Sequence, residues 1–343
     1  MRRILISESI CGGGCADPHP PASLVREGRA MLSAVLADFC RVADAEIWTT
    51  WDRRRGEHQL AGASVIGVSS PNEERRAWHE LIGEITDVLL IAPESAGVLA
   101  ERAEFFERHG CRLLGPSSSA IRLCGDKWET FRLLSSHRIP TVETSLLSRG
   151  HNPLPTNIHR FVLKPRDGAG SQEMELFERM EDIDFNKNAG YLLQPFIAGT
   201  PLSCSAMIDS TGDVEVFPIG RQFIGVENKF AYGGGEIPVE PALAANVQQA
   251  IHTMIRDVCR LIPGLRGYVG FDLILPDQSP HDPIVVEINP RLTTSYLGYR
   301  QLTPANLAER MLDRDHRTGR IRWNIGETIR FSPEWNSEAA SPT

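Results

Sequence analysis

The sequence of 343 residues lacks the features of several specialised classes of protein. No apolar run reaches the roughly 18–20 residues that a membrane-spanning helix needs. The net charge of −8 argues against a nucleic-acid or membrane-surface partner, although a local basic cleft is compatible with it. The stretch Met1–Glu8 has two arginines but no long apolar core, so we expect a first strand there and no signal peptide.

Metal-binding and redox signatures are also scarce. The ten histidines form no HxxxH or HExxH pattern, and the seven cysteines are odd in number and scattered, which favours a reducing cytoplasm. Cys11 and Cys15 are the one close pair, within a run of glycines. They are either metal or redox ligands or incidental thiols of a flexible loop, and the lack of a second pair at ligand spacing favours the loop.

The first third of the chain alternates between strand-like and helix-like segments. This alternation predicts a doubly wound α/β domain with a parallel sheet over residues 1–115. Ser23 is the expected N-cap of the first helix. The expected strands are Arg3–Ile6, Glu46–Thr49, Val65–Val68, Val88–Ile91 and Arg112–Leu114. The first expected helix ends at Phe39, and the two others span Asn72–Ile85 and Val98–His109.

The rest of the chain is richer in strands. We expect a helix capped by Asp126, a small lobe over residues 116–190 with a linker at Ser148–Asn157, a large lobe over 191–330, and a frayed tail over 331–343. This predicts a two-lobed α+β domain. Its expected strands are Phe161–Lys164, Tyr191–Gln194, Leu202–Ile208 and Val214–Ile219, and its expected later helices are Ala242–Ile262 and Pro304–Met311.

Two further apolar segments, Gly267–Ile274 and Ile284–Arg291, carry acidic residues. Alternation along a strand places Glu287, Asn289 and, if the strand continues, Arg291 on one face. If the segments pair as a hairpin, Asp272 joins them. Oxygen ligands of this kind suit Mg²⁺ with phosphate, and an arginine suits a carboxylate or phosphate.

A second constellation follows the strand Phe161–Lys164. Lys164 precedes a loop with Gly168, Gly170 and Ser171, whose backbone N–H groups could approach phosphate oxygens. The lysine precedes the glycines, so the loop is not a Walker P-loop, and a hairpin turn with a surface lysine explains it equally well. Lys127 at a helix start is compatible with phosphate binding and, more simply, with a solvated lysine.

The segment Tyr191–Gly199 is either a core strand or a hinge whose backbone binds adenine. Taken together with the preceding motifs, it resembles the ATP-grasp superfamily over roughly Gly115–Ile329. Within that superfamily the sequence is similar to the tyramine–glutamate ligases of methanofuran biosynthesis. The residues that carry this closer resemblance are Glu27-Gly28, Met31, Leu114–Ile121, Gly220–Ile224, Gly233–Glu236, Gly264–Gly270 and Glu287–Thr294.

The resemblance implies a pre-ATP-grasp α/β domain followed by the ATP-grasp domain, and a role for each motif. Arg291, with Arg221 as a second candidate, would steady the transferred phosphoryl group. Asp272, Glu287 and Asn289 would bind two Mg²⁺ or Mn²⁺ ions. The ATP contacts implied are Lys127 and Lys164 on the phosphates, Gly168, Ala169, Gly170 and Ser171 as the covering loop, and Gln194, Phe196 and Ile197 on adenine.

The hinge departs from the family pattern. Pro195 and Thr200-Pro201-Leu202 stand where acidic residues usually grip the ribose, so Ser203 or a backbone group would replace them. The implied reaction is the ATP-dependent joining of a carboxylate, glutamate by resemblance, to a tyramine-like amine through an acyl-phosphate. A ligase with another acceptor, a kinase and a nucleotide-binding protein without turnover are the alternatives, and a homodimer stays open.

Overall fold

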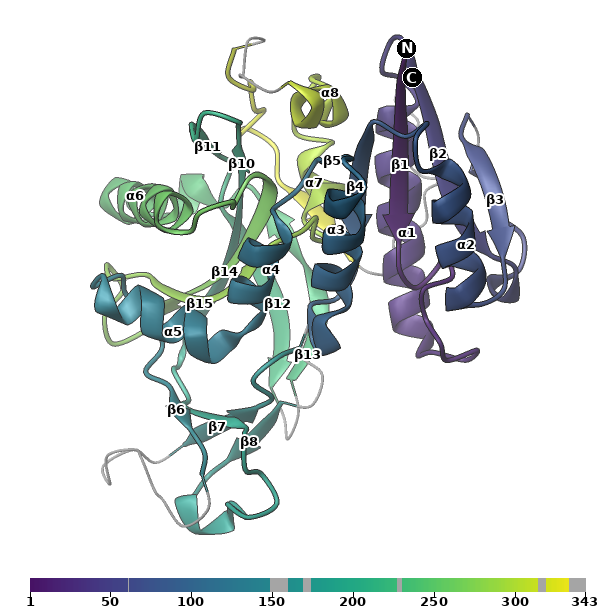
Figure 1. The fold of residues 1–343 in the computed structure, drawn as a ribbon. Coiled ribbons are helices and arrows are strands. Elements are labelled where there is room, and N and C mark those ends of the chain that lie inside the picture. The colour runs from purple at the N-terminus through teal and green to yellow at the C-terminus, as the bar shows by residue number, and fades with distance from the viewer. Residues whose placement is uncertain (61, 149–159, 169–173, 227–229, 314–318, 333–343) are drawn as a thin grey trace.

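The computed structural model describes all residues except 61, 149–159, 169–173, 227–229, 314–318 and 333–343. Three sheets organise the described chain (Figure 1): a five-stranded sheet in the N-terminal part, a four-stranded sheet in the small lobe and a seven-stranded sheet in the large lobe. This is the predicted α/β domain followed by a two-lobed α+β domain. None of the helices within the described ranges is long and apolar enough to cross a membrane.

The N-terminal sheet is parallel, with the order β3-β2-β1-β4-β5. Ile4 and Ile6 of β1 pack with α1, whereas Leu5 faces α2 and α3, so helices cover both faces of the sheet as predicted. The elements are β1 (Arg2–Glu8), α1 (Ala22–Phe39), β2 (Ala45–Asp52), β3 (Ser64–Val68), α2 (Pro71–Leu81), β4 (Asp87–Ile91), α3 (Val98–Arg108) and β5 (Arg112–Leu113).

Two predicted helix boundaries in this domain are wrong. Pro21, not Ser23, precedes the first residue of α1, because the fixed backbone of proline suits a helix start without a side-chain cap. The second helix ends at Leu81 instead of Ile85, and Gly83 with φ of +92° turns the chain towards β4.

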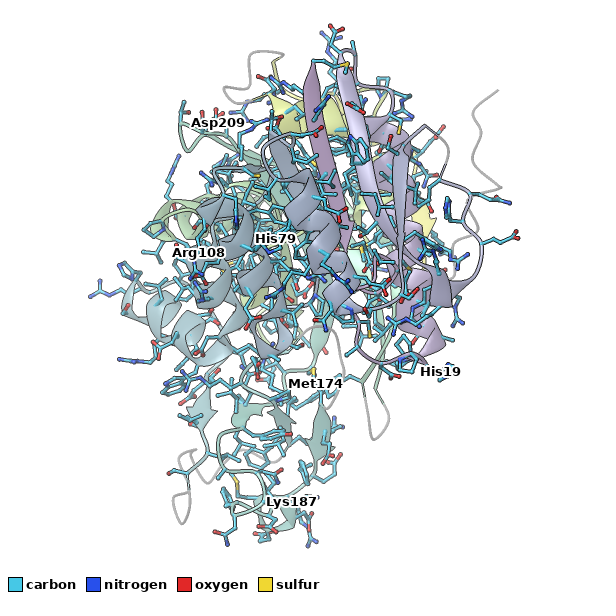
Figure 2. All side chains as sticks on the ribbon, turned by 45° about the vertical axis from the view of Figure 1, so that its right-hand side comes forward. His19, His79, Arg108, Met174, Lys187 and Asp209 are labelled. Atoms are coloured by element: carbon cyan, nitrogen blue, oxygen red, sulfur yellow. The ribbon has the colours of Figure 1, made fainter. Side chains whose placement is uncertain are left out.

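The small lobe is built around a four-stranded antiparallel sheet of order β6-β9-β7-β8. Met174 and Lys187 mark this lobe in Figure 2, and Asp209 lies at the opposite end of the molecule. The lobe has its own apolar cluster, separate from the other cores. Its strands are β6 (Ser145–Leu146), β7 (Phe161–Lys164), β8 (Glu175–Phe177) and β9 (Leu192–Pro195).

The large lobe has a seven-stranded sheet in the order β15-β14-β10-β12-β13-β16, with β11 added on β10. Helix α6 packs on it through Val247, Ile251, Ile255 and Val258, as its spacing predicts. The elements are β10 (Gly199–Ile208), β11 (Val214–Val216), β12 (Gly220–Val226), β13 (Phe230–Ile237), α6 (Ala245–Leu261), β14 (Gly267–Pro276), β15 (Ile284–Asn289), α7 (Tyr296–Tyr299), α8 (Leu307–Leu312) and β16 (Ile329–Phe331).

Two helices connect the N-terminal sheet to the small lobe. α4 (Ser118–Gly125) was not predicted, whereas α5 (Lys127–Ser136) begins as expected, with the Asp126 carboxylate accepting the N–H groups of Trp128 and Glu129. Four short 3-10 helices complete the described chain: η1 (Arg53–Arg55), η2 (Ser95–Gly97), η3 (Met180–Asp182) and η4 (Glu240–Ala242).

Other predictions for this half differ in detail or lie outside the described residues. Phe331 is buried in β16, so it does not belong to the expected tail, whose residues from 333 onward are not described. Most of the expected linker falls within 149–159, also outside the described residues. The helix expected from Pro304 begins only at Leu307, after an Asn306 cap.

Candidate active site

The hairpin of β14 and β15 brings the predicted oxygen ligands together. Asp272 lies directly opposite Glu287 in the antiparallel register. The Asn289 side chain donates a hydrogen bond to Asp272 Oδ2 at 2.9 Å, and Gln222 on β12 donates to Asp272 Oδ1 at 2.6 Å. Two carboxylates and two carboxamides from three strands therefore meet at one place in the large lobe.

Burial and neighbouring charges shift the pKa values of two side chains at this site. Burial, together with the negative charge of Glu287, raises the pKa of Asp272 to about 6 against the opposing hydrogen bonds of Asn289 and Gln222. Burial also lowers the pKa of Lys164 to about 8, although Glu287 and Asp272 favour its charged form. A buried cation and two partly buried carboxylates thus lie within electrostatic reach of each other.

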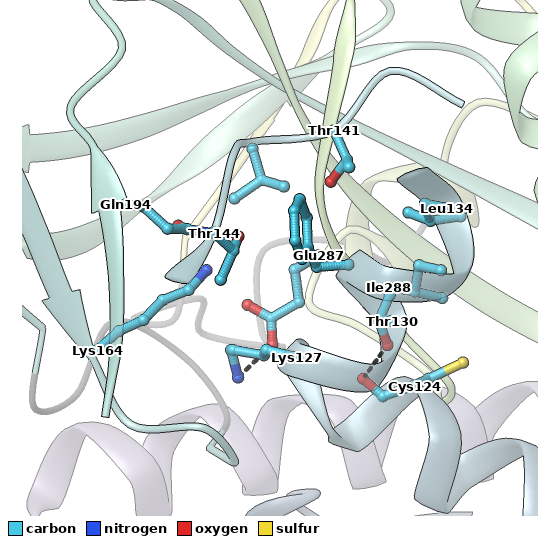
Figure 3. A pocket seen from close by; sticks show the side chains of 12 residues that line it. Cys124, Lys127, Thr130, Leu134, Thr141, Thr144, Lys164, Gln194, Glu287 and Ile288 are labelled. Atoms are coloured by element: carbon cyan, nitrogen blue, oxygen red, sulfur yellow. Dashed lines mark hydrogen bonds and ion pairs between the residues drawn. The ribbon is translucent and has the colours of Figure 1, made fainter. Parts of the chain in front are cut away.

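Lys127 links the start of α5 to Glu287 and to the carbonyl of Gly168. Its Nζ atom donates to the carbonyl of Gly168 at 2.5 Å and lies 3.1 Å from Glu287 Oε1 (Figure 3). Arg166 supports the same junction by donating to both Asp126 oxygens, from Nε to Oδ1 at 2.9 Å and from Nη2 to Oδ2 at 2.6 Å. The positive charge that we assigned to phosphate is paired here with Glu287, and Arg166 and Gly168, which follow β7, are held against α5.

A pocket lies between the small lobe, α5 and β15. Figure 3 shows Lys164 and Gln194 on one side of it, and Glu287 and Thr130 on the other. Gln194 is buried and donates to Thr144 Oγ1 at 2.7 Å, which fixes its carboxamide at the wall. The cavity is lined by Cys124, Lys127, Thr130, Phe131, Leu134, Thr141, Thr144, Lys164, Gln194, Val286, Glu287 and Ile288.

Not every predicted contact residue lines this cavity. The guanidinium carbon of Arg160 lies 4.3 Å from the centroid of the Phe196 ring. Neither Phe196 nor Ile197 is among the lining residues. Arg221 pairs with Glu236 at 3.4 Å on a partly exposed part of the sheet. Ala169, Gly170 and Ser171 lie outside the described residues, and only Gly168 of that loop is placed.

Arg291 has a partner from the N-terminal domain. Its Nε atom lies 3.0 Å from Glu94 Oε1, and both side chains are nearly buried. Glu94 follows β4 at the carboxyl end of the parallel sheet, which is where ligands bind in doubly wound domains. Burial raises the pKa of Glu94, and the positive charge of Arg291 opposes that rise. The ion pair connects the N-terminal domain to the end of β15.

Two protein-family models match the chain that carries this site. Residues 124–295, half of the chain, match the family model described as an ATP-grasp domain, and residues 45–121 match one described as a pre ATP-grasp 3 domain. The chain belongs to the ATP-grasp family. Membership implies that it binds ATP, and the cavity between the lobes of this ATP-grasp domain contains both predicted lysines.

Individual relatives of this ATP-grasp protein cover most of the chain. It is similar to a tyramine–L-glutamate ligase from Methanocaldococcus fervens, with 25% identity over 314 residues that span 90% of this chain and 92% of the relative. A solved ATP-grasp superfamily protein from Archaeoglobus fulgidus matches with a TM-score of 0.71 and 24% identity, over 94% of this chain and 90% of that one. The D-alanine–D-alanine ligase from Bacillus anthracis complexed with ATP has a TM-score of 0.64 and 14% identity, over 93% and 98%. Both structures support the fold.

The residues of this ATP-grasp domain fit a divalent cation. Among the described residues, no group of three or more His, Cys, Asp or Glu side chains could hold a metal, so a site on this hairpin has two carboxylates and needs an amide oxygen. Asn289 supplies that third ligand type. Burial, and after it the negative charge of Glu287, raises the pKa of Asp272, and a bound cation would offset the repulsion between the two carboxylates. Asp272, Glu287 and Asn289 would therefore hold the ion.

Sequence reasoning missed three residues of the site. Thr144, Gln222 and Glu94 contact predicted residues, but none of the three was assigned a role, and only Gln222 comes from a segment, Gly220–Ile224, that carried the resemblance. Glu94 had a usable signal, because a charged residue directly after a fully buried strand of a parallel sheet lies at the ligand-binding edge. Thr144 had none. Gln222 lies beside the candidate Arg221, but its contact with Asp272 arises only when β12 and β14 join one sheet.

Proposed function

We propose that this chain is an ADP-forming ligase that joins a carboxylate to an amine, with glutamate as the acid and a tyramine-like phenylethylamine as the acceptor. The observation that carries the reaction class is the meeting of Lys127, Lys164 and Glu287 in the lining of one pocket. Asp272 lies opposite Glu287 in the same hairpin and accepts a hydrogen bond from Asn289. The substrate pair is supported by the relative from Methanocaldococcus fervens, which spans 90% of the chain.

The reaction has two steps that the residues of the site would promote. A carboxylate oxygen attacks the γ-phosphorus of ATP, the bond to the β-phosphate oxygen breaks, and acyl-phosphate and ADP form. The amine nitrogen then attacks the acyl carbon, phosphate leaves with the bonding electron pair, and the nitrogen loses a proton. Lys127 and Lys164 would hold the phosphates in line, since positioning and charge neutralisation dominate catalysis of phosphoryl transfer.

Other residues of the site would neutralise the charge of the phosphates, and the site would exclude water. A bound divalent ion at Asp272, Glu287 and Asn289 would supply charge neutralisation of the phosphates. Arg291, fixed by Glu94, would face the oxygens of the acyl-phosphate. The buried setting of Lys164 strengthens its interaction with phosphate, because low local polarity weakens screening. Exclusion of water would protect the acyl-phosphate from hydrolysis.

The test is ADP release with glutamate, with and without tyramine, followed by the mass of the product. We expect sustained ADP release only when both are present, and a product that equals their sum less one water. ADP release independent of any amine would indicate a kinase that stops at phosphoryl transfer. Absence of ADP release with a full panel of acids and amines would contradict the ligase assignment.

A further inference from the structure

The strand pairing around Asp272 is the starting point. On one side Asp272 of β14 lies opposite Glu287 of β15, and on the other it lies opposite Ser203 of β10. Ser203 in turn lies opposite Gly220, the first residue of β12. Because cross-strand partners share a face, these four positions form one row across the large-lobe sheet. Gln222, two residues after Gly220, therefore lies on the face that carries both carboxylates.

The positions between Gln222 and Asp272 have little bulk. Strand β10 separates β12 from β14, so a side chain of β12 must pass over Ser203 to reach Asp272. Serine is small, Gly220 has no side chain, and Gly235, which lies opposite Gln222 on β13, has none either. Gln222 spans this gap, and its Nε2 atom donates to Asp272 Oδ1 at 2.6 Å. A side chain from two strands away is therefore a direct partner of a proposed metal ligand.

Two carboxamides fix the Asp272 carboxylate from opposite sides. Asn289 Nδ2, on β15, donates to Asp272 Oδ2 at 2.9 Å, while Gln222 donates to Oδ1 from the β12 side. An ionised carboxylate only accepts hydrogen bonds, so both carboxamides turn their N–H groups towards it and their oxygens away. Each of these bonds has a charged acceptor, which makes it stronger than a bond between neutral groups. Rotation of the Asp272 side chain would break at least one of them.

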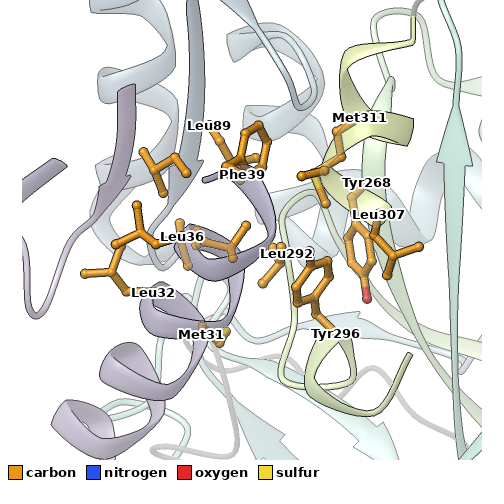
Figure 4. Packing of buried hydrophobic residues seen from close by; sticks show 14 of the residues in the cluster. Met31, Leu32, Leu36, Phe39, Leu89, Tyr268, Leu292, Tyr296, Leu307 and Met311 are labelled. Atoms are coloured by element: carbon orange, nitrogen blue, oxygen red, sulfur yellow. The ribbon is translucent and has the colours of Figure 1, made fainter. Parts of the chain in front are cut away.

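Packing fixes the backbone beneath this carboxylate. Figure 4 shows Tyr268, on the same strand β14, and Leu292, just beyond β15, among the buried residues that pack with helix α1. Phe271 and Leu273, the sequence neighbours of Asp272, belong to the core of the large lobe. The main chain at Asp272 therefore has little freedom, and the direction of its carboxylate depends on its two carboxamide partners.

A cation shared by Asp272 and Glu287 needs both carboxylates directed at one point, because Mg²⁺ requires near-ideal octahedral geometry. Strands β15 and β12 lie on opposite sides of β14, so Gln222 contacts Asp272 from the side away from Glu287. We propose that Gln222 is a positioning residue for the divalent cation, and that it holds the Asp272 carboxylate in the orientation that binds the ion together with Glu287. This proposal rests on the cation site and the ligase function proposed above.

The test uses Gln222→Met, which keeps the length of the side chain and removes its N–H groups. Mn²⁺ alone is the probe, and loss of the electron paramagnetic resonance signal of the free ion measures its binding without nucleotide or turnover. Hydrogen-bond partners of metal ligands commonly contribute about 10- to 100-fold to metal affinity, so we expect the Kd for Mn²⁺ to rise at least tenfold. Gln278→Met is the matched control and should bind as wild type. Gln278 is exposed in the loop between β14 and β15 and makes no side-chain hydrogen bond among the described residues.

Two further measurements separate positioning from other roles. In an Asp272→Ala background, Gln222→Met should cause no further loss of Mn²⁺ binding, because the carboxylate through which Gln222 acts is gone. In the ADP-release assay, the Gln222→Met variant should need at least about tenfold more Mg²⁺ for half-maximal rate, with KM for the acid and the amine unchanged. A further loss in the Asp272→Ala background would mean that Gln222 binds the ion itself, and raised KM values for both substrates would mean a disturbed sheet. Either result would overturn the positioning role.

A Gln222→Met variant that binds Mn²⁺ as tightly as the wild type would equally contradict the positioning role, and it would leave the ligase function intact. A wild-type protein that binds no Mn²⁺ would remove the cation site on which the inference rests. A wild-type protein that releases no ADP with any acid–amine pair, by contrast, contradicts the ligase function itself.

Discussion

Lys164 and Glu287 place opposite charges beside one cavity, and each is expected to be indispensable for turnover. Lys164→Ala would remove the proposed phosphate contact and Glu287→Gln the proposed metal ligand. Loss of one such charge in a water-poor site costs about 3–4 kcal/mol at the barrier, which is more than 100-fold in rate. The measurement is ADP release in the presence of both substrates, beside circular dichroism spectra that should match those of the wild type.

Lys187→Ala is the matched control for the lysine, since Lys187 is an exposed side chain of the same small lobe. It should retain wild-type rates. If Lys164→Ala or Glu287→Gln is as active as this control, the cavity is not where phosphoryl transfer occurs.

Glu8 gives a prediction about stability and pH. It is fully buried at the end of β1, accepts the N–H groups of Ile10 and Cys11, and has a pKa raised from 4.5 to about 7, mainly by burial. The folded state therefore binds an extra proton between these two pKa values, so stability from this group is present below pH 4.5 and is lost as the pH rises through 7. Between pH 5 and 8 the loss is about 2 kcal/mol.

Urea unfolding of wild type and Glu8→Gln at both pH values measures this effect. Comparison of the two proteins removes the contribution of every other titrating group. We expect the wild type to lose about 2 kcal/mol more than the variant between pH 5 and 8. Equal losses would mean that the Glu8 carboxylate titrates normally in the folded protein.

Residue type and strand alternation were enough to predict the pairing of Asp272 with Glu287 and Asn289, because local geometry determines which side chains share a face. Glu94 could not be predicted as a partner of Arg291, since it is almost 200 positions away in sequence and meets Arg291 only after two domains dock. Contacts between the two strands of a hairpin can be predicted from the local sequence, whereas contacts between the N-terminal domain and the large lobe cannot.

At the scale of elements, strands rich in β-branched and apolar residues were predicted, whereas β12 and β13 were missed. Their sequences include Gly220, Gly225 and Gly233–Gly235, and glycine is disfavoured in strands because it loses the most freedom on ordering. Close packing explains two of them: a Cβ on Gly220 would lie 2.3 Å from Ile237, and one on Gly235 would lie 2.5 Å from the Arg221 carbonyl.

Gly267, the first residue of β14, provides the test at this scale. Its φ is +67°, and a Cβ there would lie 2.2 Å from the carbonyl oxygen of Leu114, where the N-terminal domain meets the large lobe. Gly267→Ala must therefore shift the backbone as well as adopt a left-handed conformation, and we expect it to lower the free energy of unfolding by about 2–4 kcal/mol.

Gly110→Ala separates these two causes, because Gly110 has φ of +76° and no atom within 4 Å of a built Cβ. The free energy of unfolding of this control should fall by only about 1–2 kcal/mol, which is the cost of the left-handed conformation itself. Chemical denaturation of both variants is the measurement, and an equal loss would mean that the contact with Leu114 is relieved without cost.

At the scale of the whole molecule, the cores show which parts unfold together. One cluster combines Ile4 and Ile6 of the first strand with Leu292, Tyr296 and Phe331 near the end of the described chain, so the N-terminal domain and the large lobe share a hydrophobic interior. Among the described residues, the small lobe instead has a separate, smaller cluster formed by Leu147, Phe161, Leu163, Ile183 and Leu193. Fewer buried contacts mean a smaller free energy of local opening.

Amide hydrogen exchange should therefore separate the small lobe from the rest. We expect the amides of β7 and β9 to exchange at least tenfold faster than those of β1 and β14, since β1 and β14 contribute to the larger cores of the N-terminal domain and the large lobe. A non-hydrolysable ATP analogue should slow exchange in β7 and β9, because Lys164 and Gln194 line the cavity from these strands. Identical exchange in all four strands, with and without the analogue, would show that the molecule opens as one unit and that the small lobe does not move to admit the nucleotide.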